Sequence, residues 1–399
     1  MITSLALIFL VGLSMAFICQ KIKIPRIIGM LITGIVLGPF VLDFLDPSIL
    51  AISSELRRMA LIIILIKAGL SLDISDLKQI GLPAVLMSFL PAVFEIIGFV
   101  IFGPVILGMT RLEAAITGAV LGAVSPAVVV PRMVELMEKK YGTDKKIPQL
   151  VLAGASLDDV FVIVLFQAFV SMAQGNGISV RSFIDVPVSI VLGIAIGALS
   201  GIFLAFIFDL FYRHGHKIRN SLKVIIILGS SFLLMAVEGW VEPWVAVSGL
   251  LAVMSMACFI QKKSSKEVAS RLSQKYGKLW LCAEVILFVM VGAAVDIRYT
   301  LDAGLGAVLA IFIALGFRSV GVVLCLLGTN LNAKERLFCV ISYLPKATVQ
   351  AAIGSVPLSL GLPCGKLVLS VAVISILITA PLGAFLMDGT YKKFLLKQE

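Results

Sequence analysis

Two adjacent carboxylates, Asp158 and Asp159, lie in the middle of the apolar segment "LAGASLDDVFVIVLF" (152–166). An ionised carboxylate in hydrocarbon is so unfavourable that such residues usually mark a functional site. Adjacent residues of a helix point about 100° apart, so one carboxylate can face a cavity while the other faces a neighbouring helix. Burial and mutual repulsion should allow at least one of them to hold a proton at physiological pH. Carboxylate oxygens also suit hard cations, so the pair is a candidate site for a proton or a cation, but not easily for both.

Three further charged residues lie within apolar segments. Glu95 stands in "FLPAVFEIIGF" and Arg318 in "IALGFRSVGVV", 223 positions later. A buried carboxylate and a guanidinium become tolerable when they are paired, and arginine stays protonated. We expect Glu95–Arg318 to be a structural ion pair beside the site; in an alternative interpretation, Glu95 is part of a cation path. Lys346 could neutralise the carbonyl ends of a helix or pair with an aspartate.

The composition predicts the kind of element that must position these charges. The chain has 399 residues, of which 60% are hydrophobic and 14% charged, with a mean hydropathy of +1.11. A soluble chain would carry about 25% charged residues. Apolar segments of about 17–25 residues, long enough to span a bilayer, follow one another along the chain. The sequence therefore predicts an all-α polytopic membrane protein that forms one transmembrane domain over residues 1–399.

Thirteen helices are expected from the apolar segments. Their predicted ranges are 2–19, 24–40, 56–72, 82–107, 113–137, 148–173, 183–211, 221–238, 243–261, 278–295, 301–328, 335–356 and 366–388. Most of the 33 lysines and arginines then fall in loops on one side. The positive-inside rule places the C-terminus in the cytoplasm and the N-terminus outside, in the cell (inner) membrane. The net charge of +10 thus indicates topology, and no nucleic-acid partner is expected.

An internal repeat relates the two halves of the chain. The segment "LIKAGLSLDISDL" (65–77) resembles "FVMVGAAVDIRYTL" (288–301), with Gly69 aligned to Gly292 and Asp73 to Asp296. The predicted topology places these segments in opposite orientations, so the repeats, at about 1–175 and 221–388, are inverted and joined by a connector helix at about 183–211. Inverted repeats with interrupted helices are typical of secondary transporters, whose site lies near the membrane midplane.

The interrupted helices are expected at matching positions. Pro126 and Pro131 lie in "GAVLGAVSPAVVVPRMVE", and Pro345 lies in "VISYLPKATVQAAIGSVP". Each proline removes a backbone donor and disfavours helix at the preceding residue. Unwound backbone is tolerated at membrane depth where it lines a cavity or is buried in protein. We therefore predict two crossed, discontinuous helices next to the aspartates.

Hydroxyl groups near the breaks could complete a cation site. The candidates are Ser125, Ser156 and Thr348. Hydroxyls that merely pack between helices are an equally good interpretation of each. No nucleophile–base arrangement or phosphate-binding loop is recognisable, so we expect neither an enzyme nor a cofactor.

Four separated motifs carry a family resemblance. "SPAVVVPRM", "GASLDDVFVIVLF", "LIKAGLSLD" and "YLPKATVQAAIGS" resemble the monovalent cation–proton antiporter superfamily, and most closely its NHA-type sodium/proton antiporters with paired aspartates. The resemblance covers essentially the whole chain. It implies a homodimer in the lipid bilayer that exchanges Na⁺, and also Li⁺, for protons by alternating access, with a core domain moving against a dimerisation domain.

The resemblance also implies roles for single residues. Asp159 would be the main carboxylate for Na⁺ and the proton, and Asp158 its assisting neighbour. Glu95, Arg318 and Lys346 match charged positions of the NHA branch. Because Arg318 stands where many electrogenic relatives carry a lysine, the paired aspartates alone do not indicate two protons per cation.

Three other functions remain open at this point. A potassium/proton antiporter of the same fold is poorly distinguished by the motifs. A passive cation channel would be expected to show a continuous filter. A sodium-coupled organic-anion symporter is disfavoured, because a buried aspartate pair between helix breaks suits ions better than a large organic solute.

Overall fold

The computed structural model describes residues 1–22, 24–71, 81–175, 180–214, 218–241, 244–245 and 247–398, and all its named elements are helices. The chain divides into two compact units. Unit 1 comprises Met1–Arg57, Ser75–Gln174 and Val285–Glu399, and unit 2 comprises Arg58–Ile74 and Gly175–Glu284. Each unit contains segments from both predicted repeats, and the single transmembrane domain stays a prediction.

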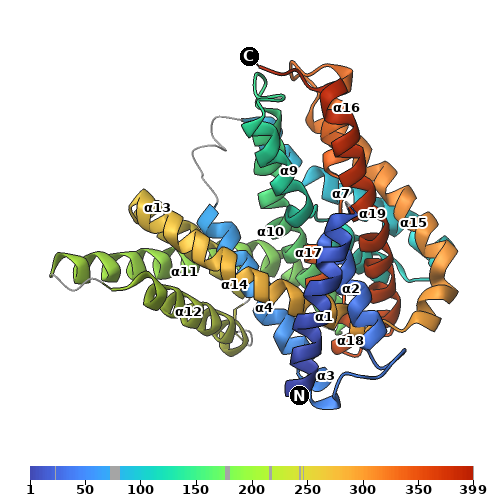
Figure 1. Cartoon of the computed structure of the whole chain (residues 1–399), viewed down its shortest axis with the longest axis horizontal. Coiled ribbons are helices and arrows are strands. Elements are labelled where there is room, and N and C mark those ends of the chain that lie inside the picture. Colours follow the sequence, from blue (N-terminus) through green and yellow to red (C-terminus); the bar gives the residue numbers. More distant parts are fainter. Residues whose placement is uncertain are drawn as a thin grey trace. The chain divides into compact units, whose positions relative to one another are not determined.

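Most helices belong to unit 1 (Figure 1). In chain order they are α1 (Ile2–Lys21), α2 (Arg26–Leu37), α3 (Pro47–Ala51), α6 (Leu82–Met87), α7 (Leu90–Leu107), α8 (Arg111–Leu121), α9 (Pro126–Glu138), α10 (Ile147–Ala173), α15 (Ile297–Cys325), α16 (Ala333–Ser342), α17 (Thr348–Ile353), α18 (Val356–Ser359) and α19 (Gly365–Phe394). Unit 2 holds α11 (Val180–Arg213), α12 (Asn220–Val241) and α13 (Gly249–Lys263). Two helices have parts in both units, α4 (Ser53–Ser71) and α14 (Lys266–Ala293).

Eight helical segments of the described chain are long and apolar enough to cross a membrane. They are Ile2–Lys21, Leu82–Leu107, Arg111–Glu138, Val191–Arg213, Asn220–Val241, Glu267–Ala293, Gly304–Cys325 and Gly365–Phe394. Each of the thirteen predicted segments overlaps an observed helix, which confirms the polytopic helical class, while the number of thirteen membrane spans stays a prediction.

Two predicted helices have boundaries that hydropathy does not indicate. The segment predicted at 82–107 is divided into α6 and α7 at Ser88 and Phe89, and Pro91, in the first turn of α7, lacks the N–H that would continue the α6 hydrogen bonds. The helix predicted to begin at 278 begins at Lys266, twelve positions earlier. Its first turns are polar, and Arg271 pairs with Glu267 four residues before it, so side-chain pairs extend this helix beyond its apolar part.

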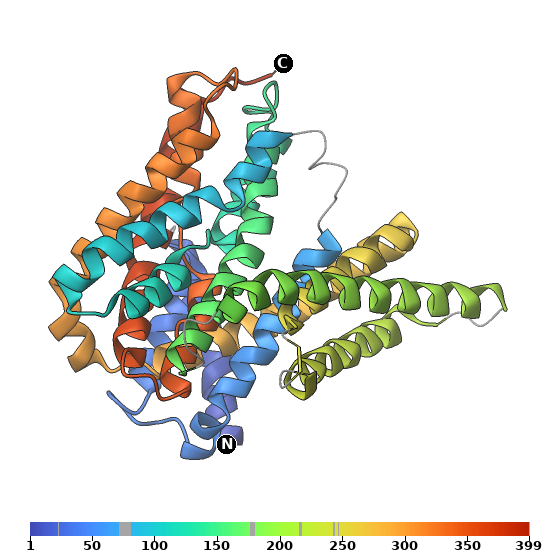
Figure 2. The same cartoon turned by 180° about the vertical axis from the view of Figure 1, so that it is seen from behind.

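The interrupted segment α8–α9 lies deep within unit 1. In Arg111–Glu138, 78% of the most apolar window is buried, compared with 28% in Ile2–Lys21. Helix α10 packs against both α8 and α9, and α7 packs against α8 and along α15 (Figure 2). Helix α19 packs against α15, α16 and α17. The helices that carry the predicted site residues therefore pack against one another within unit 1.

Contacts at both chain ends join segments that the topology prediction places on the same side. The amino group of Met1 lies 3.2 Å from Asp46 Oδ2. At the other end, the Gly142 N–H donates to the Leu396 carbonyl (2.7 Å) and the Gln398 N–H to the Lys140 carbonyl (2.8 Å). The basic loop after α9 and the C-terminus thus share one side of unit 1.

Unit 2 is assembled around a row of glycines on α11. Gly193, Gly197 and Gly201 recur every fourth residue, and a Cβ on any of them would lie 2.2–2.7 Å from a backbone oxygen of the facing segment. Those oxygens belong to Ser248, Ala252 and Met256. Small residues at this spacing let two helix backbones approach closely, which is how helices pack in lipid.

Candidate functional site

Two helices are interrupted at equivalent positions. Helix α8 ends at Leu121 and α9 begins at Pro126, while α16 ends at Ser342 and α17 begins at Thr348. Both first halves start with a capping box, formed by Thr110 and Glu113 in α8 and by Asn332 and Glu335 in α16. The starts of α16 and α17 each come 222 positions after those of α8 and α9. The interrupted helices of the two repeats are thus related by an offset of 222 residues, whereas Glu95 and Arg318 are related by an offset of 223.

The prolines behave differently from one another. Pro126 is the first residue of α9, and Pro345 lies in the unwound segment before α17, so both predicted breaks are confirmed. Pro131 lies inside α9 and does not break it, which corrects the prediction for this residue. One proline removes a single backbone hydrogen bond, and a buried transmembrane helix can continue when its other bonds are retained.

The two breaks contact each other directly. The Ser125 N–H donates to the Pro345 carbonyl at 2.8 Å. The buried side chain of Gln350 joins both segments: Nε2 donates to the carbonyls of Ala123 (2.8 Å) and Leu121 (3.3 Å), and Oε1 accepts the Ala347 N–H (2.7 Å). The predicted crossing of the interrupted helices is therefore present, and three backbone groups of the first break, on Leu121, Ala123 and Ser125, find partners on the second.

Gln350 was missed by the sequence reasoning. The sequence does contain a signal for it. Gln350 is a lone amide in the apolar run after Pro345, where an interrupted helix leaves backbone carbonyl and N–H groups without partners. An amide supplies both donors and an acceptor, so it can satisfy both kinds of group at once.

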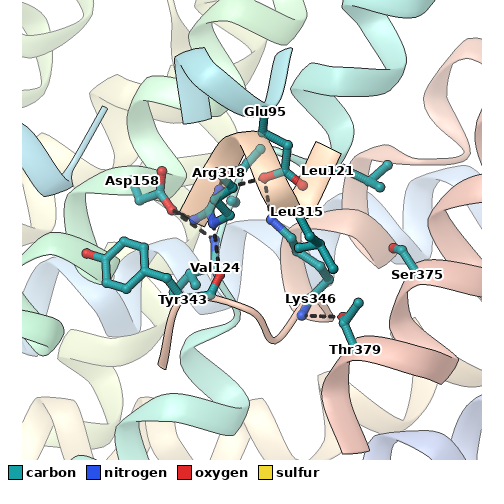
Figure 3. A network of polar contacts seen from close by, with 12 residues as sticks. Glu95, Leu121, Val124, Asp158, Leu315, Arg318, Tyr343, Lys346, Ser375 and Thr379 are labelled. Carbon is teal, nitrogen blue, oxygen red and sulfur yellow. Dashed lines mark hydrogen bonds and ion pairs between the residues drawn. The ribbon is translucent and has the colours of Figure 1, made fainter. Parts of the chain in front are cut away.

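Arg318 is the centre of the charged cluster (Figure 3). Its Nη1 lies 2.7 Å from Glu95 Oε2 and its Nη2 lies 2.9 Å from Asp158 Oδ2. Nε donates to the Tyr343 carbonyl at 2.8 Å, and Nη1 also donates to the carbonyl of Gly122 in the first break. The predicted Glu95–Arg318 ion pair is confirmed, but Arg318 binds Asp158 as well.

Lys346 pairs with Glu95 and not with an aspartate. Its Nζ lies 2.6 Å from Glu95 Oε2, the same oxygen that Arg318 contacts. Its backbone N–H donates to Thr379 Oγ1 on α19 at 2.9 Å (Figure 3). Lys346 is fully buried, and a buried ammonium requires such a counter-charge.

The two aspartates differ in their surroundings. Asp158 is fully buried, and its Oδ2 accepts the Val124 N–H (2.9 Å) as well as Arg318. Asp159 is 8% exposed and interacts electrostatically with Asp158 and Arg318, but no other described residue pairs with it or hydrogen-bonds to it. The fold thus brings Arg318 and the first break to Asp158 and leaves Asp159 without a fixed partner among the described residues.

The predicted hydroxyl ligands lie at the ends of the half-helices. Ser125 Oγ precedes α9 and Thr348 Oγ1 begins α17; both are buried, and neither finds a hydrogen-bond partner among the residues that the structure describes. Three carboxylate oxygens, Glu95 Oε1, Asp158 Oδ1 and Asp159 Oδ1, share this property. The side chain of Ser156 lies outside the described residues, and so does Asp73.

Comparisons with known proteins agree with this geometry. A family model described as "Sodium/hydrogen exchanger, transmembrane" matches residues 5–388. Sodium/hydrogen exchanger 9B2 of Homo sapiens is 33% identical over 389 residues, covering 94% of this chain and 71% of that protein. Sodium/hydrogen exchanger 9B1 of Homo sapiens is 31% identical, covering 91% of this chain and 71% of that protein.

A solved structure shows the same fold. The sodium proton antiporter MjNhaP1 from Methanocaldococcus jannaschii, at pH 8, superposes with a TM-score of 0.85 at 22% identity, over 98% of both chains. A second structure of MjNhaP1 gives a TM-score of 0.74 at 23% identity, over 97% of this chain and 95% of that chain. The apolar helices, the crossed breaks and the family match together show that this chain is an integral membrane protein of the sodium/hydrogen exchanger family.

Proposed function

We propose that this protein exchanges Na⁺ for protons across a membrane, and that the two ions compete for Asp159. The charge balance of the buried cluster carries this proposal. Three carboxylates, those of Glu95, Asp158 and Asp159, face two cations, Arg318 and Lys346. When all five are ionised, one negative charge is left over. A buried unpaired charge is strongly unfavourable, so the cluster requires one further positive charge, which a proton or a monovalent cation can supply.

Asp159 is the member of the cluster at which this charge would bind. Glu95 and Asp158 have fixed partners at 2.6–2.9 Å, whereas Asp159 has none among the described residues and is the most exposed of the three. A proton on Asp159 removes its charge, and Na⁺ on its oxygens compensates it. Both cannot be present without a surplus of positive charge. This exclusion couples the ions, and the unpartnered oxygens of Asp158, Ser125 and Thr348 are candidate further ligands for Na⁺ or Li⁺.

The other cluster members hold the site in place. Arg318 cannot release its proton, so it serves as a permanent counter-charge that ties α15 to α7, α10 and both breaks. We propose that the site is exposed alternately to the two sides, in a homodimer in the cell membrane whose N-terminus is outside and whose C-terminus is cytoplasmic. No cofactor is required by this scheme.

Proton flux in proteoliposomes tests the proposal. The purified protein is reconstituted with a fluorescent pH dye and a preformed pH gradient, and NaCl, LiCl, KCl or choline chloride is added in turn. We expect Na⁺ and Li⁺ to collapse the gradient and the Asp159→Asn variant to abolish this effect. Asp209→Asn, which alters an exposed pair with Arg213, is the matched control and should leave exchange intact.

Each alternative has its own outcome in this assay. Undiminished flux in Asp159→Asn contradicts the site assignment. A response to K⁺ alone indicates a potassium/proton antiporter, and cation movement without proton movement indicates a channel. Dimerisation is measured separately, from the mass of the detergent-solubilised protein.

A further inference from the structure

Tyr343 carries a hydroxyl that the cluster described above does not use. The residue follows α16 at the second break and is fully buried. Its carbonyl accepts from Arg318 Nε, and its ring centre lies 5.4 Å from the Arg318 guanidinium carbon. Figure 3 shows the hydroxyl end of the ring pointing away from Arg318. The backbone and the ring therefore support the arginine, while the hydroxyl projects elsewhere.

This hydroxyl finds no hydrogen-bond partner in the described part of the chain. A buried polar group without a partner is unfavourable, and such groups in a folded protein require an explanation. A phenylalanine would support Arg318 with the same ring and would leave no unpaired group. Support of the arginine alone therefore does not explain why this residue is a tyrosine.

The hydroxyl lies against the aspartate-bearing helix. A Cβ built on Gly154 of α10 would lie 2.0 Å from Tyr343 Oη, so only a glycine leaves room for the hydroxyl. Gly154 precedes Asp158 by four residues and is therefore one turn from it on the same face of α10. The hydroxyl thus stands one helical turn before Asp158, on the side of α10 that leads to its first residue, Ile147.

We propose that the Tyr343 hydroxyl is a step of the ion path between the aspartates and the end of α10 at Ile147. This inference rests on the proposed cation–proton exchange at Asp159. A tyrosine hydroxyl can donate one hydrogen bond and accept others, so its oxygen can bind a partly dehydrated Na⁺ and its O–H can donate a hydrogen bond to a carboxylate. The partner that the hydroxyl lacks in the static structure is then the transported ion as it enters or leaves.

Removing the hydroxyl separates this role from packing. Because Tyr343→Phe breaks no hydrogen bond between described residues, packing alone predicts unchanged transport and equal or higher thermal stability. The ion-path role predicts a KM for Na⁺ raised about three- to tenfold, as for one lost hydrogen bond to an ion, and a shifted pH profile, again without loss of stability. The matched control is Tyr276→Phe in unit 2: its hydroxyl donates to the Val224 carbonyl at 2.9 Å, so this variant should lose stability and keep its KM.

The outcomes separate this inference from the proposed function. Wild-type kinetics in Tyr343→Phe overturn the ion-path role, and so does a loss of stability in this variant, which would show that the hydroxyl has a structural partner. Neither result affects the exchange itself, which fails only if the wild type moves no protons when Na⁺ is added. A second protein, with 3,5-difluorotyrosine at position 343, keeps the hydroxyl but makes it more acidic. An unchanged pH profile in that protein also overturns the inference.

Discussion

Asp158 Oδ2 lies 2.9 Å from Arg318 Nη2, and the same oxygen accepts the Val124 N–H at 2.9 Å. This arrangement makes the two neighbouring aspartates unequal. Asp158 is an anion held between a permanent cation and the N–H of a helix break, whereas Asp159 has no such partner within the described structure. The pair therefore combines one fixed charge with one that can be neutralised by an ion.

The two aspartates should differ in their effect on stability. Asp159→Asn removes the unpaired charge, so we expect the melting temperature to stay equal or to rise while exchange is lost. Asp158→Asn removes a partner of Arg318, so we expect a loss of about 3–5 kcal/mol in the free energy of unfolding. Thermal-shift measurements of both variants in detergent test this order. A lower melting temperature for Asp159→Asn than for Asp158→Asn would reverse the assignment.

A charge swap between Glu95 and Arg318 should not rescue the protein. A simple pair would tolerate Glu95→Arg combined with Arg318→Glu. In the structure, however, the swap would bring a carboxylate to Asp158 and an arginine to Lys346. We expect the double variant to be no more stable than either single variant, whereas Glu95→Gln with Lys346→Gln should recover part of the stability lost in Glu95→Gln alone. Full recovery in the swap would contradict the shared cluster; the measurement is a double-mutant cycle of unfolding free energies.

Gln350 should position the first break. Gln350→Leu leaves the Ala123 and Leu121 carbonyls and the Ala347 N–H without a partner. Hydrogen bonds between transmembrane segments contribute about 1–2 kcal/mol at most, so a loss of roughly 2–4 kcal/mol is expected, together with slower exchange. The control is Thr390→Val, which removes a hydroxyl bonded only to Leu386 within its own helix. Equal stability of the two variants would show that the amide does not hold the crossing.

Exchange should not depend on the membrane potential. Because Asp159 is the one carboxylate that binds either a proton or Na⁺, one proton should be exchanged for one Na⁺, and no net charge should cross the membrane. Moving one uncompensated charge would couple to about 2.3 kcal/mol per 100 mV. Initial rates are therefore measured in vesicles whose potential is clamped with K⁺ and valinomycin. A rate that changes with the clamp would mean that a second group, with Lys346 the first candidate, also releases a proton.

Much of the site was predictable because its signals are local. Asp158, Asp159 and Lys346 stand out as charges in apolar runs, and Pro126 and Pro345 act on the backbone next to them. The pairing of Glu95 with Arg318 was predictable for a different reason: the internal repeat supplies a distance relationship between distant segments. The division between α6 and α7 at Ser88 and the earlier start of α14 were not predictable. A hydropathy profile shows how long an apolar segment is, but not whether the helix is continuous or extends beyond that segment.

The amino-acid sequence by itself determined the membrane class, the polytopic helices, the positions of both breaks and the residues of the charged cluster, since each of these follows from the chemistry of a short segment. Only the tertiary structure decided the partners. Lys346 binds Glu95 and leaves Asp158 to Arg318, Gln350 links the two breaks, and Asp159 remains unpaired within the described chain. Partner choice depends on distances of a few ångströms between helices that are far apart along the chain, and the free energy of a buried charge is governed by those distances.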